Sequence, residues 1–165
     1  MNAEKRLTAR MELESRQELE APRDEVFAAL SDFPMVERKL MQQGVDIRRC
    51  AGPEPAGSGT RWHARFKLQG KQREAEVTLE RYQPPREMVF ALSVAGIVAH
   101  LKIVVEALSE ERCRVIVTCE LVAKTLSARL MLQPLKLNRG KVERKVDARI
   151  ADYARDLEGR LSRSA

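Results

Sequence analysis

The chain has 165 residues, of which 44% are hydrophobic and 33% are charged, and its formal net charge is +6. This composition argues against disorder, and no apolar run reaches the about 20 residues of a membrane-spanning helix, so we expect one domain over residues 1–165 with a weakly ordered segment at 1–9. A chain of this length buries roughly 70% of the surface that its unfolded form exposes, which is enough for one sizeable core.

The first quarter of the chain predicts a strand followed by two short helices. Charged and less polar residues alternate over 12–20, which is typical of a strand with one face in water, and Pro22 ends the pattern. Apolar residues then recur at helical spacing over 26–30 and again over 36–40. Asp32 is placed to cap the second of these helices.

Alternation with a period of two dominates residues 45–121 and predicts six further strands. A loop rich in glycine and proline over 51–59 follows the first of them, and short polar turns over 69–71 and 110–112 join later ones. Connections this short imply an antiparallel sheet. The residues that the alternation places on its apolar face are Trp62, Phe66, Val77, Leu79, Phe90, Leu92, Leu101, Ile103, Val115 and Val117.

The last segment changes period and predicts a long amphipathic helix, with a kink or short break near Pro134 and Gly140. It is the only long element that can cover the apolar face of a seven-stranded sheet. The expected fold class is therefore α+β, a curved antiparallel sheet round a C-terminal helix, with two short helices between strands one and two. A sheet curved round one helix leaves space in its concavity, which predicts a cavity. The helix stripe is Val142, Val146, Ile150, Tyr153, Leu157 and Leu161.

Several segments resemble the START-like superfamily, also called SRPBCC, which includes polyketide cyclases and lipid-transfer domains. They are Leu19–Phe33, Gly57–Trp62, the Tyr82–Pro85 strand end and the terminal helix, so the resemblance covers essentially the whole chain. It implies a helix-grip fold with a hydrophobic pocket between sheet and helix. It implies neither the identity of a ligand nor catalysis, since these motifs are structural.

We therefore expect the chain to bind or carry a hydrophobic small molecule, such as a lipid, an isoprenoid or an aromatic metabolite. The expected anchors are aromatic, and the glycine-rich loop at 52–59 is the expected mobile lid. An ordinary packed core with no ligand is the alternative. The predicted ligand-binding residues are Trp62, Phe66, Val77, Leu79, Phe90, Leu92, Leu101, Ile103, Val117, Val146, Ile150 and Tyr153.

The polar groups predicted to point inward are few, namely Ser15, Gln17, Cys113, Cys119 and the Tyr153 hydroxyl. This set suits one or two orienting hydrogen bonds and does not suit a catalytic triad or a carboxylate pair, so we expect no catalytic residue and no cofactor. A cyclase, dehydrase or hydrolase that polarises a carbonyl through Tyr153 or Gln17 is the enzymatic alternative.

Histidines and cysteines give no pattern of metal ligands. His63 and His100 fall on the outward face of separate strands, and no third ligand accompanies them. The odd number of cysteines, with no C-x-x-C pair, predicts free thiols in a reducing compartment. Because no apolar run follows the charged N-terminus, we expect no secretory signal and a cytoplasmic location.

The net charge of +6 belongs to the end of the chain. Residues 1–123 hold 19 basic and 19 acidic side chains, whereas residues 124–165 hold 11 and 5. A solvated face, with Glu143, Asp147 and Asp152 pairing along the helix, is the default interpretation. Weak contact with an anionic membrane or an acidic protein is the alternative, while nucleic acid is not expected because no recognition motif is present. The cations are Lys136, Arg139, Lys141, Arg144, Lys145 and Arg149.

Overall fold

A computed structural model describes residues 9–164, so nearly all of the segment expected to be weakly ordered lies outside the described residues. The elements follow the predicted order of one strand, two short helices, six strands and a helical C-terminus. They are β1 (Arg10–Leu19), α2 (Arg23–Leu30), α3 (Phe33–Gln42), β2 (Asp46–Ala51), β3 (Arg61–Leu68), β4 (Lys71–Gln83), β5 (Glu87–Val94), β6 (Ile97–Ala107), β7 (Cys113–Ala123), α4 (Leu126–Leu137) and α5 (Arg139–Ser164).

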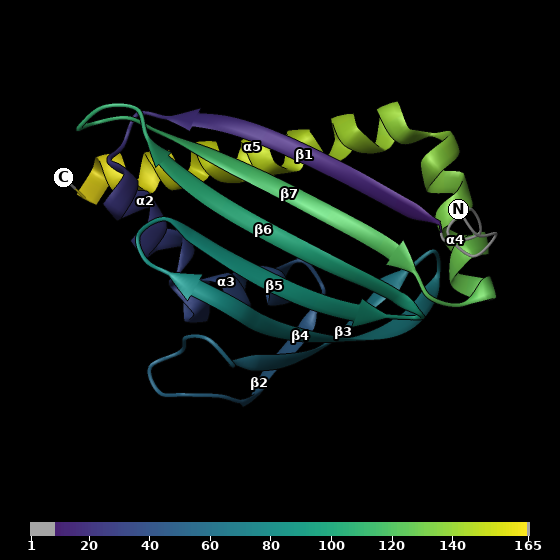
Figure 1. Ribbon diagram of the computed structural model, residues 1–165. Helices are drawn as coiled ribbons and strands as arrows, with labels where there is room; N and C mark the ends of the chain where they lie inside the picture. The colour runs from purple at the N-terminus through teal and green to yellow at the C-terminus, as the bar shows by residue number, and fades with distance from the viewer. Residues whose placement is uncertain (1–8, 165) are drawn as a thin grey trace.

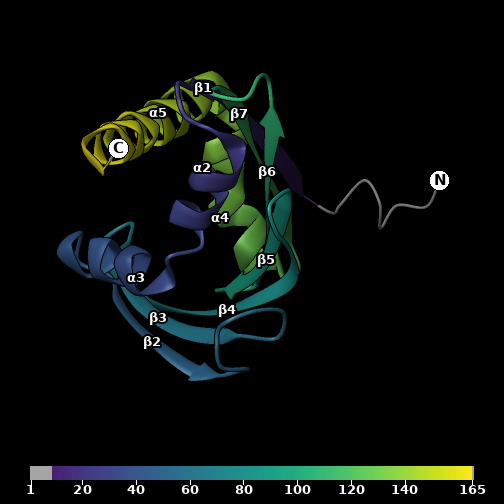
Figure 2. The ribbon, with the colours of Figure 1, turned by 90° about the vertical axis from the view of Figure 1, so that its left-hand side faces the viewer.

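The seven strands form one antiparallel sheet in the order β1-β7-β6-β5-β4-β3-β2. Strands β2 to β7 follow one another as hairpin neighbours, and β1 joins the edge beside β7. The sheet curves, and α5 runs along its concave side (Figures 1 and 2). The predicted fold class is therefore confirmed.

The two short helices begin where the sequence predicts, and their N-cap residues explain why. Pro22 occupies the N-cap position of α2, where its missing N–H costs nothing. The Asp32 carboxylate accepts a hydrogen bond of 3.3 Å from the Met35 amide at the start of α3. Helix α3 packs mainly against β2, so it projects over the half of the sheet that α5 leaves uncovered (Figure 2).

The C-terminal helix is divided at Asn138 into α4 and α5, which agrees with the expected break. Thr125 caps α4, because its Oγ1 accepts a hydrogen bond of 3.1 Å from the Ala128 amide. Gly96, in the β5–β6 turn, has φ +80° and lies against this cap; a Cβ there would be 2.5 Å from Thr125 Oγ1. Only glycine allows the turn and the helix start to approach so closely.

The buried residues form two clusters on the concave side. The first lies beneath α2, α3 and the C-terminal half of α5, and it includes Phe27, Trp62 and Leu157. The second lies beneath α4 and the beginning of α5, and it includes Leu13 and Leu132. Among the described residues, no helix combines the length and apolar composition needed to cross a bilayer.

Candidate ligand cavity

A cavity of about 460 Å³ lies in the first cluster, between the concave face of the sheet, α3 and α5. Well-packed cores contain few voids larger than a water molecule, whereas ligand pockets measure roughly 300–1,000 Å³. The concave side is therefore not fully packed at this place. The lining residues are Gln17, Leu19, Leu30, Phe33, Val36, Glu37, Leu40, Ile47, Trp62, Val77, Met88, Phe90, Leu92, Leu101, Ile103, Val115, Val117, Ile150, Tyr153, Ala154 and Leu157.

Strand alternation supplies most of the lining. In an antiparallel sheet the side chains at i and i+2 face the same side, so β5, β6 and β7 each contribute residues of one parity. Met88 and Phe90 of β5 are in register with Ile103 and Leu101 of β6, and Leu92 is in register with Ala99. Helix α5 closes the opposite side through residues spaced three and four apart.

Aromatic rings form one wall of the cavity. The ring centroids of Phe33 and Trp62 are 5.4 Å apart, and Phe90 lies 6.2 Å from Trp62 and 6.4 Å from Phe33. These separations and tilted orientations are the ones that aromatic pairs prefer. The chain has one tryptophan, so its fluorescence reports directly on this wall.

One carboxylate, Glu37 on α3, lies at this aromatic wall. Its Oε2 accepts hydrogen bonds from Trp62 Nε1 at 2.9 Å and from Arg49 Nη2 at 3.1 Å. The guanidinium of Arg49 also lies 5.9 Å from the Trp62 ring centroid. The three side chains hold one another in place, and Glu37 is the only charged residue in the lining.

A second polar contact joins α3 to α5. The Lys39 ammonium pairs with the Asp156 carboxylate and lies 4.8 Å from the centroid of the Tyr153 ring. The hydrogen bond from Lys39 lowers the pKa of Asp156 below its ordinary value. Since Tyr153 lines the cavity, this contact connects the two helices that face each other across it.

The inward polar residues of β1 are engaged with α5. Ser15 Oγ donates to Asp147 Oδ1 at 2.5 Å, and Gln17 Nε2 donates to the same oxygen at 3.0 Å and to Ser15 Oγ at 3.0 Å. Ser15 is only 3% exposed. Asp147 is exposed, as predicted for the solvated face of the helix, and it also links β1 to α5.

The structure places most of the predicted ligand-binding residues in the cavity lining. These are Trp62, Val77, Phe90, Leu92, Leu101, Ile103, Val117, Ile150 and Tyr153. As ligand contacts they remain predictions.

Three predicted residues lie outside the lining. Phe66 is four residues beyond Trp62 on β3, about 13 Å along the strand, and stands opposite Arg73. Leu79 is fully buried in the first cluster, and Val146, one turn before Ile150, packs against the second. Leu79 and Val146 have the predicted apolar surroundings, Phe66 belongs to neither buried cluster, and none of the three lines the cavity.

Helix α3 is the wall that the sequence analysis missed. It contributes Phe33, Val36, Glu37 and Leu40, whose spacing of three and four is the signal of one helix face. The loop at 52–59, expected to be a lid, contributes no lining residue. The C-terminal end of the loop is held against β4, because the Gly59 amide donates a hydrogen bond of 2.8 Å to the Leu79 carbonyl.

The remaining candidate residues have ordinary surroundings. Burial raises the pKa of the Cys113 thiol to about 11, helped by nearby Glu158, and burial also raises the pKa of Cys119. A raised pKa disfavours the reactive thiolate. His63 and His100 point away from the cavity, towards glutamates at 3.8–4.0 Å. Within residues 9–164, no three His, Cys, Asp or Glu side chains come together as metal ligands would.

A curved antiparallel sheet that encloses an apolar cavity against a long C-terminal helix defines the helix-grip class of protein. Solved structures of similar shape include a START superfamily protein, norcoclaurine synthases and an aromatase/cyclase, and the chain has this START-like fold. No protein-family model and no curated protein matches the sequence.

Three of these structures illustrate the likeness. The Zhui aromatase/cyclase from a Streptomyces species has a TM-score of 0.65 at 13% identity, over 89% of this chain and 94% of its own. A norcoclaurine synthase point mutant from Thalictrum flavum, in complex with a transition-state analogue, has a TM-score of 0.64 at 15% identity, over 90% and 96%. A START superfamily protein from Mycobacterium smegmatis has a TM-score of 0.62 at 12% identity, over 93% and 99%. At these identities the likeness establishes the fold.

Proposed function

We propose that the protein binds one largely apolar small molecule, such as a lipid, an isoprenoid or an aromatic metabolite, in the cavity between the sheet, α3 and α5. The observation that carries the proposal is the composition of the lining. Apart from Gln17, Glu37 and Tyr153, every lining residue of the 460 Å³ cavity is aliphatic, aromatic or methionine. Burying apolar ligand surface there gains roughly 25 cal/mol per Å².

The polar groups of the lining indicate how such a ligand is oriented. The Glu37 oxygen Oε2 is engaged by Trp62 and Arg49, and Oε1 accepts no hydrogen bond from a described residue. A carboxylate oxygen accepts hydrogen bonds only. The proposed ligand therefore places a hydroxyl or N–H group towards Glu37 and its apolar body along β5 to β7.

A cyclase or dehydrase activity in the same cavity is the second candidate. It is favoured by Gln17 and Tyr153, which line the cavity as the sequence predicts, and by the fold shared with an aromatase/cyclase. Against Gln17 as the group that polarises a carbonyl, its amide N–H₂ already donates to Ser15 and Asp147. Tyr153 is therefore the residue on which this candidate depends.

A cytoplasmic location completes the proposal. Cys50, Cys113 and Cys119 are all free, and Cys50 is exposed. An exposed free thiol suits a reducing compartment.

Binding can be tested with the neutral probe N-phenylnaphthylamine, which has an apolar body and one N–H group. We expect its fluorescence to rise on binding and that of Trp62 to fall, because Trp62 lines the cavity. Val117→Phe puts a larger side chain into the cavity and should weaken both signals. Val104→Phe makes the same change on the opposite face of the sheet, because Val104 follows the lining residue Ile103, and it should leave both signals intact.

The proposal fails if the wild type gives no signal, or if both variants bind as the wild type does. Native mass spectrometry of protein from its own host should also show a retained apolar molecule that Val117→Phe has lost. If candidate substrates are turned over, and Tyr153→Phe stops turnover but keeps probe affinity, the cyclase candidate replaces simple binding.

A further inference from the structure

Helix α4 carries apolar side chains on two opposite faces. Ala128 and Leu132 are completely buried and hold the helix on the second core cluster. On the other side Leu126, Leu130 and Leu137 are 68%, 66% and 79% exposed. Among the described residues these are the three most exposed large apolar side chains.

The exposed leucines form a single stripe. They are separated by four and by seven residues, and at 3.6 residues per turn this spacing aligns them along one side of the helix. From Leu126 to Leu137 the stripe is about 16 Å long. An ordinary amphipathic helix has one apolar face, which packs against the protein core. Helix α4 packs one apolar face against the second core cluster and exposes a second apolar face to solvent.

The stripe is accompanied by an excess of positive charge. Residues 124–142 contain five basic side chains and no acidic one. Arg139 is engaged, because it pairs with Glu143 at 2.8 Å. Lys124, Lys136 and Lys141 form no ion pair with any described residue. Lysines therefore lie at both ends of the exposed leucines.

We infer that α4 docks the protein on an anionic lipid surface, with its leucines in the interface and its lysines at the phosphate groups. A helix with an apolar stripe beside lysines and arginines lies in the plane of such a surface, where each basic residue adds to the attraction. The aliphatic stem of lysine lets its ammonium reach the phosphates while the leucines insert.

Other occupants fit less well. If α4 packed against α4 of a second copy about a two-fold axis, the lysines beside the leucine stripe of one chain would lie close to those of the other chain. These like charges would repel each other. A stripe one helix wide also falls well short of the roughly 800 Å² per partner of a stable protein interface, whereas a lipid surface requires only the stripe.

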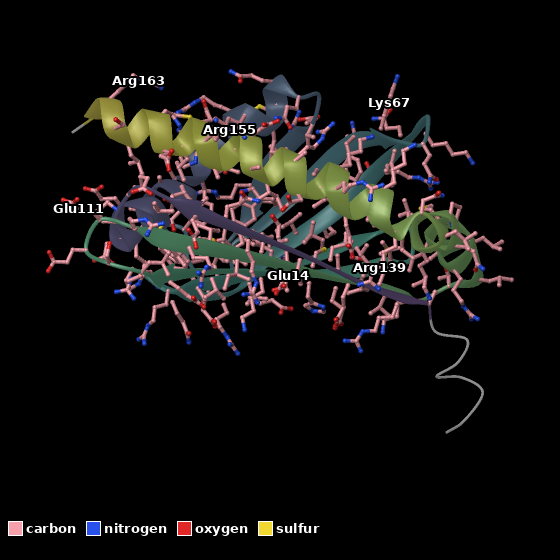
Figure 3. The ribbon with its side chains drawn as sticks, turned by 90° about the horizontal axis from the view of Figure 1, so that it is seen from above. Glu14, Lys67, Glu111, Arg139, Arg155 and Arg163 are labelled. Carbon is pink, nitrogen blue, oxygen red and sulfur yellow. The ribbon has the colours of Figure 1, made fainter. Side chains whose placement is uncertain are left out.

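Docking through α4 keeps the lipid surface away from the α5 residues that line the cavity (Figure 1). Helix α4 lies at one end of the molecule, and α2 and the C-terminus lie at the other (Figure 1). Along α5, Arg139 is at the α4 end, whereas Arg155 and Arg163 are towards the opposite end (Figure 3). The α5 residues of the cavity fall between positions 150 and 157. The inference itself does not depend on the proposed ligand.

The test is flotation of the full chain with vesicles. Vesicles of equal parts phosphatidylcholine and phosphatidylglycerol should carry the protein upward, those of phosphatidylcholine alone should not, and added salt should release it. The double variant Leu126→Gln/Leu137→Gln should weaken binding by at least about tenfold, because two inserted side chains are lost. Both side chains are exposed, so the melting temperature should not change.

Charge is tested with a matched pair of variants. Lys124→Glu/Lys136→Glu should weaken binding by roughly tenfold or more. Arg155→Glu/Arg163→Glu changes the net charge equally in the part of α5 farther from α4 and should stay within about twofold of the wild type (Figure 3).

The inference is overturned if the wild type does not float, if it floats equally with phosphatidylcholine alone, or if the two charge variants behave alike. Size-exclusion chromatography gives a further check. Self-association of the wild type that the leucine variant abolishes, without vesicle binding, would assign this face to a second copy of the chain.

Discussion

At the residue scale, we expect Glu37, which pairs with Arg49, to affect which ligand charge the cavity accepts. Its carboxylate is the only charged group in the lining and is held by Trp62 and Arg49. A second carboxylate placed beside it in apolar surroundings would meet a like charge without water to screen it. The cavity should therefore discriminate against anionic amphiphiles.

Decanol and decanoate, which have the same chain length, make this selectivity measurable. We expect decanol to displace N-phenylnaphthylamine at a concentration at least about tenfold lower than decanoate requires. In Glu37→Gln the ratio of these two concentrations should be smaller. Glu14→Gln, an exposed glutamate of β1, is the control and should keep the wild-type ratio. An unchanged ratio in Glu37→Gln would mean that the carboxylate does not face the ligand.

A second residue, Asp147, connects the edge of the sheet to α5. Asp147→Ala would leave the buried Ser15 hydroxyl without its acceptor, and an unsatisfied buried polar group costs about 1–3 kcal/mol. We expect urea unfolding to show a loss in this range, with Asp147→Asn losing less because its amide oxygen still accepts. Asp152→Ala, on the same helix, should cost under about 0.5 kcal/mol. Equal losses at the two aspartates would refute the link.

Sequence alone predicts which residues face inward but not what they contact. A period of two places Leu101, Ile103 and Val117 on the concave face, because strand geometry permits nothing else. Asp147 is hydrogen-bonded to Ser15, 132 positions away in the sequence, and to Gln17, 130 positions away. No local sequence pattern predicts contacts between residues so far apart. Leu79 shares the correct face, yet only packing determines that it adjoins solid core instead of the cavity.

At the element scale, α3 is held to the sheet through Glu37, which bonds to Trp62 and Arg49, and to α5 through a separate contact. It packs against β2, and one polar contact, Lys39 with Asp156 and Tyr153, ties it to α5. Lys39→Met should therefore speed dissociation of the bound probe several-fold in stopped-flow fluorescence. The free energy of unfolding should change by less than about 1 kcal/mol, as for other surface ion pairs. Arg38→Met, an exposed change on the same helix, should leave the dissociation rate unaltered.

Acid should have the same effect as Lys39→Met. The pKa of Asp156 is lowered in the folded protein, so its contribution is complete above the ordinary carboxyl pKa and is lost as the pH falls through the lowered value. Probe dissociation in the wild type should accelerate below about pH 4, and Lys39→Met should lack this acceleration. An identical pH profile in both proteins would exclude Asp156 as its cause.

The helices also show where prediction from sequence stops. Pro134 and Gly140 predicted the break between α4 and α5, because both residues disfavour a continuous helix. The loop at 52–59 was expected to close the cavity because its glycines permit motion, but Thr60 is fully buried beside it, and Gly57 N–H bonds to Thr60 Oγ1 at 3.0 Å. Composition indicates flexibility, whereas the position of a loop relative to a cavity depends on the complete fold.

On the scale of the whole molecule, the concave side divides into a solid half and a hollow half. The second cluster, beneath α4, is closed by Leu132, which has no exposed surface. The first cluster surrounds the cavity, to which Leu101 contributes. Stability and binding should therefore depend on different halves of one sheet.

A pair of identical substitutions separates these two roles. Leu132→Ala opens a new hole in solid core and should cost about 3–5 kcal/mol in urea unfolding, with probe affinity unchanged in the folded protein. Leu101→Ala enlarges a space that already exists, so fewer packing contacts are lost, and the cost should be nearer 1–2 kcal/mol. Its probe affinity should fall instead, because a wall of the binding site has receded. If Leu101→Ala proved the more destabilising change, the space beside Leu101 would be filled by packed side chains in solution, and the cavity would not be available to a ligand.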